Sequence, residues 1–188
     1  PGLAALAREV VPDLPLHAST QMTVHTAEGI LWAARRGFAR VVLAREVPLP
    51  EVEEIVRQGE KAGIGIEVFI HGALCYAYSG QCLLSSFIGG RSGNRGMCAQ
   101  PCRKPYTLVR GDVDGFGRPT ACSPVPVGDR YLLSTRDLSV YPVLDRVVRA
   151  GVVALKIEGR MRSPGYVAVV TSVYRRALDQ IREGTWQP

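Results

Sequence analysis

The sequence lacks the long apolar run of roughly 20 residues that a membrane-spanning helix requires. It also lacks the basic-then-apolar N-terminus of a secretory signal. Both absences favour a cytoplasmic protein with no membrane partner. The chain of 188 residues begins at Pro1 instead of Met, and its first residues already read as part of an α/β pattern. We therefore expect a fragment of a longer protein.

Two common signatures of hydrolytic enzymes are also missing. The sequence has no Gly-x-Ser-x-Gly elbow and no His-Glu-x-x-His helix, and its histidines are His17, His25 and His71. A peptidase needs an activated nucleophile or a metal-bound water with a base in reach. Cys75 with His71, four residues upstream, is the pairing that the sequence offers. Proteolysis stays an alternative hypothesis on this ground.

Acidic residues are absent from residues 68–111. The whole chain carries a formal charge of +6 and an isoelectric point near 9.3. A solvated basic loop fits this pattern, and so does a surface that binds RNA phosphates or another anionic substrate. The basic side chains of this interval are the substrate-binding candidates Arg91, Arg95, Arg103 and Lys104, together with Arg110.

Cysteine is absent outside one interval, in which five occur with the spacing Cys75-x6-Cys82-x15-Cys98-x3-Cys102-x19-Cys122. Disulfides are disfavoured in a reducing cytosol, and a chain of this size can build its own core. Five thiols beside Gly, Ser and Arg are also too many for small buried hydrophobes. The cluster therefore predicts a thiolate-bound metal.

The spacing favours an iron–sulfur cluster over zinc. Zinc sites usually contain Cys-x2-Cys knuckles, which are absent here. Irregular spacing suits a cluster whose ligands come from a folded loop. Backbone amides of the glycine-rich residues 89–96 can approach cluster sulfurs, and Arg91 and Arg95 would offset the negative charge of the site. Spacing alone does not identify which four of the five cysteines are ligands.

Short β-rich runs alternate with amphipathic segments on both sides of the cysteines. The runs predict strands at 16–18, 39–43, 64–70, 131–133 and 152–157, and helices at 26–36, 51–61, 140–150 and 166–182. Repeated βα units indicate an α/β fold with a parallel sheet, or a partial (β/α) TIM-like barrel interrupted by a long Cys-rich insertion after a central strand. We predict βα units in 1–72, the basic cluster-binding segment in 73–130 and closing βα units in 131–188.

Functional side chains in such folds gather where strands end. Gln21 and Glu46 follow the first and second predicted strands and are further substrate-binding candidates. His71 ends the third strand, while Glu158 and Arg160 follow the last. These three are the catalytic candidates, although His71 also suits a loop contact and the other two suit a structural ion pair.

Three stretches of the sequence form recognisable motifs. They are residues 67–86, which contain His-Gly-Ala-Leu-Cys, residues 90–103 with Gly-Arg-Ser-Gly-Asn-Arg-Gly-Met-Cys-Ala-Gln-Pro-Cys, and residues 156–163, Lys-Ile-Glu-Gly-Arg-Met-Arg-Ser. Together they resemble one known family, the collagenase-like U32 peptidases. The second stretch is most similar to the branch that hydroxylates a 23S ribosomal RNA cytidine. The resemblance implies a (β/α)-barrel-like fold whose first units precede Pro1.

The same resemblance implies two kinds of activity and a cofactor. Members are catalogued as collagenase-like peptidases, whereas others are oxygen-independent hydroxylation factors for transfer RNA, ribosomal RNA or ubiquinone precursors. By resemblance to the ubiquinone proteins we expect a [4Fe–4S] cluster, with zinc as the alternative. Cys75, Cys82 and Cys98 match ligand positions. Relatives often carry a further cysteine where this chain has Ser139, so Cys102 is the expected fourth ligand and Cys122 its alternative.

The sequence therefore leads to an RNA base hydroxylase, or a subunit of one, as the main hypothesis, with ribosomal or transfer RNA as partner. A collagenase-like peptidase is one alternative. A non-catalytic iron–sulfur scaffold that delivers electrons to, or holds, a partner protein is the other.

Overall fold

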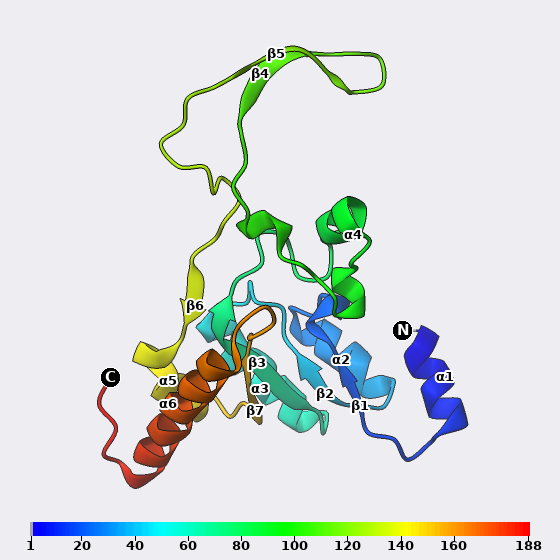
Figure 1. Cartoon of the computed structure of the whole chain (residues 1–188). Coiled ribbons are helices and arrows are strands. Elements are labelled where there is room, and N and C mark those ends of the chain that lie inside the picture. The colour runs from blue at the N-terminus through cyan, green and yellow to red at the C-terminus, as the bar shows by residue number, and fades with distance from the viewer. Residues whose placement is uncertain (1) are drawn as a thin grey trace. The chain divides into compact units, whose positions relative to one another are not determined.

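The computed structural model of the chain describes residues 2–188. It divides into two compact units (Figure 1), which we name the sheet unit, Pro1–Cys82 with Arg136–Pro188, and the insertion unit, Leu83–Thr135. Within the described residues, no helix has the length and apolar character needed to cross a membrane.

A five-stranded sheet organises the sheet unit. Its parallel strands are β1 (Leu16–Ala18), β2 (Phe38–Val42), β3 (Gly65–Ala73) and β7 (Ala154–Ile157). The fifth strand, β6 (Asp137–Ser139), runs antiparallel to the end of β3, where Ser139 lies opposite His71. The predicted α/β fold with a parallel sheet is confirmed. The sheet is open, and no closed barrel forms among residues 2–188.

The helices of the sheet unit begin and end at residues suited to those positions. Thr26 caps α2 by accepting a hydrogen bond from the Gly29 amide, and Ser163 caps α6 through the Tyr166 amide. Gly151 follows α5 with a φ of +87°, which glycine adopts without steric cost. The helices are α1 (Gly2–Val10), α2 (Ala27–Arg35), α3 (Leu49–Lys61), α5 (Leu144–Arg149) and α6 (Pro164–Glu183), with short 3-10 turns η1 (Thr20–Met22) and η4 (Tyr141–Val143).

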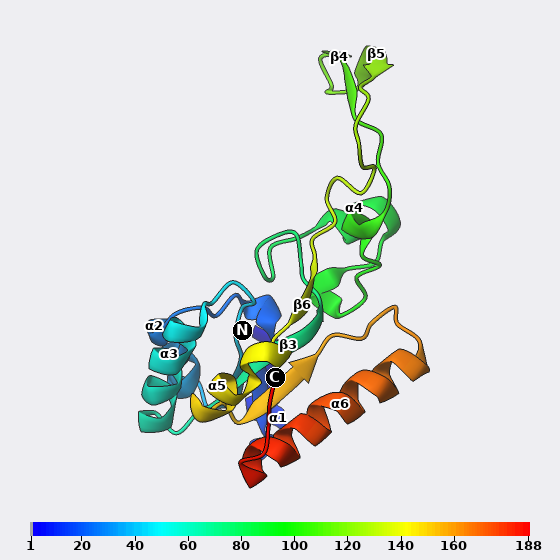
Figure 2. The same cartoon turned by 90° about the vertical axis from the view of Figure 1, so that its left-hand side faces the viewer.

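One face of the sheet forms the hydrophobic core. Ile66, Val68 and Ile70 of β3 are buried there against apolar side chains of α2, α3, α5 and α6, and these helices follow one another around the sheet (Figure 2). Because side chains alternate along a strand, Glu67 and Phe69 point to the opposite face. That face carries the polar groups discussed below.

The insertion unit contains little regular structure. Its elements are α4 (Leu84–Gly89), the 3-10 turns η2 (Gly93–Arg95) and η3 (Pro101–Arg103), and an antiparallel hairpin of β4 (Val109–Val113) and β5 (Pro119–Pro124). At the hairpin turn, the Asp114 carboxylate accepts hydrogen bonds from the amides of Phe116 and Arg118, each at 2.8 Å. Neither this hairpin nor α4 is predicted by the sequence pattern.

Most predicted elements of the sheet unit are confirmed within a few residues, but the strand predicted at 131–133 is wrong. The Asp129 side chain accepts a hydrogen bond from the Tyr131 amide at 2.9 Å, and the Ser134 amide bonds to the Tyr131 carbonyl. These local contacts form a turn in place of a strand, because a short polar side chain competes with the sheet for backbone amides. The strand of this region comes later, as β6.

Candidate functional site

The loop of residues 74–82, which we name the cysteine loop, follows β3 and carries Cys75 and Cys82. Its anchor is Ser79, which is 1% exposed. The Ser79 amide donates to one carboxylate oxygen of Glu46, and the Ser79 hydroxyl donates to the other at 2.9 Å. The Arg45 amide in turn donates to the Ser79 hydroxyl at 3.3 Å. The loop is thus tied to the residues that follow β2.

A second set of contacts ties the cysteine loop to the residues that follow β1. The Thr23 hydroxyl donates to the Ser79 carbonyl at 2.7 Å and accepts from the Gln81 side chain at 2.9 Å. Gly80 has a φ of +81°, and a Cβ at this position would lie 2.4 Å from the Gln21 carbonyl oxygen. Only glycine fits such a close approach. Residues that follow β1 and β2 therefore hold the backbone between Cys75 and Cys82 in place.

These contacts also perturb the ionisation of Glu46. Burial raises the pKa of this carboxyl, but the hydrogen bonds from Ser79 and the positive charge of Arg45 lower it by more, so the net pKa lies below its ordinary value. Glu46 is consequently an anion at neutral pH and a good acceptor for both Ser79 donors. In this structure Glu46 holds the loop, and Gln21 presents its carbonyl to Gly80.

None of the five cysteines forms a disulfide within the described residues. Cys75 and Cys82 lie in the sheet unit and are half-buried; Cys98 and Cys102 lie in the insertion unit and are half-buried as well. Cys122 is exposed on β5, where its thiol contacts the Thr120 carbonyl at 3.3 Å. Within neither unit do three or more His, Cys, Asp or Glu side chains among residues 2–188 form a metal-binding group.

The surroundings of Cys98 fit a thiolate ligand. Its sulfur accepts a hydrogen bond from the Gln100 amide at 3.3 Å, and the neighbouring Ala99 amide donates to the buried Ser85 hydroxyl at 3.0 Å. Amide donors to sulfur stabilise the negative charge of cluster ligands. Half-buried, unlinked thiols with such donors suit an iron–sulfur cluster better than a disulfide or a packed core.

Cys122 has a structural explanation instead. It lies across the hairpin from Gly111, where an added Cβ would come within 2.5 Å of the Cys122 sulfur. The thiol therefore fills the space above a glycine in the hairpin. This placement favours Cys102 over Cys122 as the fourth ligand of the predicted set.

His71 is half-buried near the end of β3 within an aromatic cluster. Its ring centroid lies 5.5 Å from that of Tyr174 and 6.1 Å from that of Tyr166. The Tyr174 hydroxyl donates to the Ile70 carbonyl at 3.0 Å and contacts His71 Nδ1 at 3.2 Å. A phenol has one proton, so Nδ1 must be the donor in the second contact, and Nε2 of a neutral His71 carries the lone pair. Burial raises the pKa of Tyr174, which keeps the phenol protonated.

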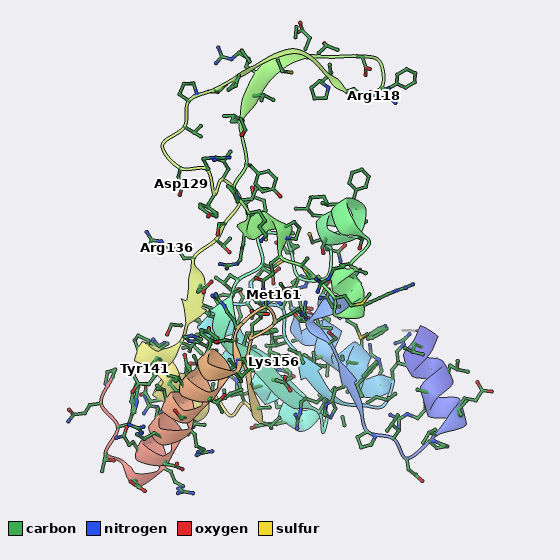
Figure 3. All side chains as sticks on the ribbon, viewed as in Figure 1. Arg118, Asp129, Arg136, Tyr141, Lys156 and Met161 are labelled. Atoms are coloured by element: carbon green, nitrogen blue, oxygen red, sulfur yellow. The ribbon has the colours of Figure 1, made fainter. Side chains whose placement is uncertain are left out.

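Glu158 and Arg160 follow β7 beside this cluster. The Glu158 amide donates to the His71 carbonyl at 2.8 Å, and the Arg160 amide donates to a Glu158 carboxylate oxygen at 3.0 Å. The Arg160 side chain is exposed. Met161 continues this loop with a φ of +65° (Figure 3). The contact described here between Glu158 and Arg160 is made by the Arg160 backbone amide, and the roles expected of the two side chains stay predictions.

The basic candidates of the insertion unit are mostly at its surface. Arg91, Arg95 and Lys104 are exposed, and the Arg91 guanidinium donates to the Met97 carbonyl at 3.0 Å. Arg103 is half-buried and donates to the Thr135 hydroxyl at 3.3 Å. Phe87 of α4 is 91% exposed. An exposed aromatic ring with neighbouring arginines is a combination that binds single-stranded RNA.

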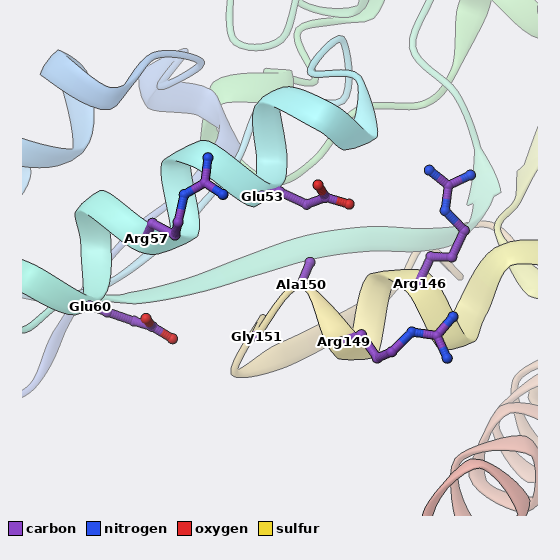
Figure 4. Close-up of a pocket in the computed structure, with 7 residues that line it drawn as sticks. All are labelled: Glu53, Arg57, Glu60, Arg146, Arg149, Ala150 and Gly151. Atoms are coloured by element: carbon purple, nitrogen blue, oxygen red, sulfur yellow. The ribbon is translucent and has the colours of Figure 1, made fainter. Parts of the chain in front are cut away.

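A groove of about 560 Å³ lies at the other end of the sheet unit, between α3 and α5 (Figure 4). Arg57 pairs there with Glu54, and Arg149 pairs with Asp145. Both ion pairs lie within single helices, and the groove lies near the residues that precede the amino ends of β3 and β7. Its lining residues are Glu53, Arg57, Glu60, Arg146, Arg149, Ala150 and Gly151.

Sequence reasoning missed Ser79, Thr23 and Tyr174. Ser79 stands in a Ser-Gly pair just before Cys82, a turn signal that could have marked it as an anchor. Tyr174 lies inside a long amphipathic helix, where nothing in the sequence distinguishes a tyrosine that contacts His71 from a core tyrosine.

Comparisons with known proteins agree on one family. The model of peptidase family U32 matches residues 1–188. The chain is 43% identical over 173 residues to the 23S rRNA 5-hydroxycytidine C2501 synthase of Escherichia coli, covering 92% of this chain and 24% of that protein. It is 40% identical over 176 residues to tRNA hydroxylation protein P1 of Bacillus subtilis, covering 92% of this chain and 39% of that protein.

A relative with a different name matches about as well. The chain is 39% identical over 180 residues to a collagenase of Porphyromonas gingivalis, covering 91% of this chain and 41% of that protein. The chain thus spans less than half the length of these relatives.

Proposed function

Because the chain belongs to peptidase family U32, we propose that it takes part in the oxygen-independent hydroxylation of a base in ribosomal or transfer RNA. The proposal rests on the sequence identity between this chain and two proteins named for RNA hydroxylation. Each of these two alignments covers 92% of the chain. Exposed Arg91, Arg95 and Lys104 supply the positive surface that RNA phosphates require.

We further propose that Cys75, Cys82, Cys98 and Cys102 hold a [4Fe–4S] cluster. Their half-buried thiols, none of which is in a disulfide, and the amide donor to Cys98 suit a thiolate-bound metal. The absence of Cys-x2-Cys spacing favours the iron–sulfur cluster over zinc. When bound, such a cluster supplies one-electron redox chemistry. The anchoring of the cysteine loop by Ser79 and Glu46 holds the backbone between two of these ligands in place.

The remaining candidates orient the substrate and move protons. His71 is held by Tyr174 with its proton on Nδ1, so Nε2 is available to accept a proton from the base that is modified. Glu158 is positioned by the Arg160 amide next to the same strand end. The sheet itself is proposed to be part of a (β/α) barrel in the full-length protein, which acts in the cytoplasm on its RNA.

The cluster is tested by anaerobic purification of the chain, with its visible spectrum and its iron and sulfide contents. Cys75→Ser and Cys82→Ser should each lose most of the iron. Cys122→Ser is the matched control and should keep it, because Cys122 packs in the hairpin. Stoichiometric zinc without iron would refute the cluster.

The reaction is tested separately in a strain that lacks the full-length protein. Mass spectrometry of its ribosomal and transfer RNA nucleosides should show the loss of one hydroxylated base, which the wild-type gene restores. His71→Gln should restore less of it than the wild type at equal iron content. Unchanged nucleosides in the deletion strain would refute RNA hydroxylation.

Because one relative is named a collagenase, proteolysis is a second candidate function. A cysteine peptidase would pair His71 with Cys75 through Nε2, because Nδ1 contacts Tyr174. Cleavage of gelatin by metal-free protein, abolished by Cys75→Ala, would support the peptidase instead.

A further inference from the structure

The face of the sheet opposite the core carries an excess of positive charge. Glu67 of β3 is 9% exposed and bridges two cations, with Arg40 at 3.3 Å and Lys156 at 3.0 Å. One carboxylate therefore faces two positive groups. A lysine ammonium has three donors, so Lys156 keeps donors beyond its contact with Glu67.

A third cation lies on the same face. The Arg45 guanidinium stacks on the Phe69 ring at 4.5 Å from its centroid, and the Lys156 ammonium lies 5.7 Å from the same centroid. Phe69 and Lys156 are register partners on β3 and β7, which places both cations on this face. Together with the carboxylates of Glu67 and of Glu46, which neighbours Arg45, the three cations Arg40, Arg45 and Lys156 leave a net charge of plus one.

The half-buried Arg45 side chain has an unused donor. Its Nε is buried and donates to no acceptor among residues 2–188. The neighbouring Glu46 carboxylate, which interacts with the Arg45 charge, is hydrogen-bonded by Ser79. The Arg45 backbone amide donates its hydrogen bond to the Ser79 hydroxyl. A guanidinium held by stacking, with an unused donor, is prepared to bind an oxyanion.

The location suits a ligand. Arg45 follows β2, Phe69 is the middle residue of β3, and Lys156 lies in the second half of β7, so Arg45 and Lys156 lie toward the carboxyl ends of parallel strands. Ligands of such sheets bind at this end. The Lys156 side chain is 43% exposed, so a ligand can reach it from solvent.

We propose that Arg45 and Lys156, whose cationic groups both lie over the Phe69 ring, form a phosphate-binding site. The site deepens the proposed function, since it would hold the phosphate of the nucleotide whose base is modified. Glu67 acts as a positioning residue, because its carboxylate fixes the Lys156 ammonium.

The test is calorimetric titration of the purified chain in chloride buffer with cytidine 5′-monophosphate, cytidine and inorganic phosphate. Cytidine 5′-monophosphate should bind at least about tenfold more tightly than cytidine, and Arg45→Met should weaken it by about tenfold. Arg36→Met is the matched control, because Arg36 stacks on Trp32 at 4.1 Å but caps the end of α2, away from Phe69 in the sequence. It should leave the affinity unchanged.

A second variant distinguishes loss of the phosphate contact from loss of the fold. Arg45→Lys keeps the charge but removes the Nε donor, and it should bind the monophosphate with intermediate affinity. Competition by a short RNA without terminal phosphates would assign the site to a phosphodiester, whereas competition by inorganic phosphate alone would assign it to a free phosphate. Equal affinities for cytidine and its monophosphate, or equal affinities of the two methionine variants, would overturn the proposal.

The measurement does not depend on hydroxylation. Loss of monophosphate binding in Arg45→Met together with unchanged nucleosides in the deletion strain would refute the proposed function and leave the phosphate site standing. The reverse combination, a lost hydroxylated base with no effect of Arg45 on binding, would refute the phosphate site alone.

Discussion

The two edges of the sheet unit are built from similar polar residues in different ways. At the carboxyl edge, the buried Ser79 joins Glu46, Arg45 and Thr23 through hydrogen bonds between segments far apart in the sequence. At the amino edge, the groove of Figure 4 is lined by side chains whose ion pairs lie within single helices and face solvent.

This difference implies that side-chain positions are fixed at the carboxyl edge and adjustable at the amino edge. A buried polar group that loses its partner keeps its desolvation penalty, whereas an exposed ion pair exchanges its partner for water at little cost. The carboxyl edge should therefore tolerate few substitutions, and the amino edge many. The cysteine loop, His71 and the proposed phosphate site all belong to the intolerant edge.

The largest effect is expected at Gly80. Gly80→Ala would place a Cβ 2.4 Å from the Gln21 carbonyl at a φ of +81°, and it should lower the free energy of unfolding by roughly 3 kcal/mol or more. Urea denaturation measures this change. Gly63→Ala is the control, since Gly63 has a φ of +69° but no atom within 4 Å of an added Cβ. Equal losses in the two variants would mean that the backbone conformation, and not the close approach, constrains Gly80.

A smaller loss is expected from Ser79→Ala. Removal of this hydroxyl leaves a carboxylate oxygen of Glu46 and the Arg45 amide without their partner, at a cost of about 1–3 kcal/mol. Chemical denaturation gives the value. The exposed Ser172, whose hydroxyl bonds to the Val169 carbonyl in its own helix, is the control and should lose far less as Ser172→Ala. A stable Ser79→Ala variant that still loads iron would show that the loop needs no anchor.

Acidification should weaken the same edge. The pKa of Glu46 is lower in the folded protein than its ordinary value of 4.5. Its contribution to stability is therefore present above that ordinary value and is lost as the pH falls through the folded pKa. Thermal denaturation between neutral and acidic pH should show a steeper loss for the wild type than for Glu46→Gln, because glutamine does not titrate. Parallel curves would exclude Glu46 as a source of acid sensitivity.

The sequence predicts the sheet unit better than the insertion unit, because local signals determine its elements. Caps such as Thr26 and stops such as Gly151 mark helix ends, and β-branched runs mark the strands. In the insertion unit, the Asp129 turn replaced a predicted strand, since one side-chain hydrogen bond outweighed a weak β pattern. The overlooked hairpin at Asp114 had an Asp-Gly signal in the sequence.

The site was predictable in residue type but not in role. Glu46 and His71 were predicted as site residues because they stand at or just after the carboxyl ends of predicted strands, and parallel strands end on the same side of a sheet. Their partners were not predictable, since Ser79 is 33 residues from Glu46 and Tyr174 is 103 residues from His71. Periodicity determines which face a side chain occupies, but it does not determine which distant side chain it meets.

The smallest effect is expected at the amino edge, at Arg149. Arg149→Ala removes an ion pair with Asp145 within α5, in which the arginine side chain is 69% exposed. Exposed pairs at this spacing contribute less than about 0.5 kcal/mol, so urea denaturation should barely distinguish the variant from the wild type. Its iron content and its affinity for cytidine 5′-monophosphate should also be unchanged. A loss as large as that of Ser79→Ala would contradict the contrast between the edges, because it would mean that a solvated pair fixes the fold as firmly as a buried hydrogen-bonded one.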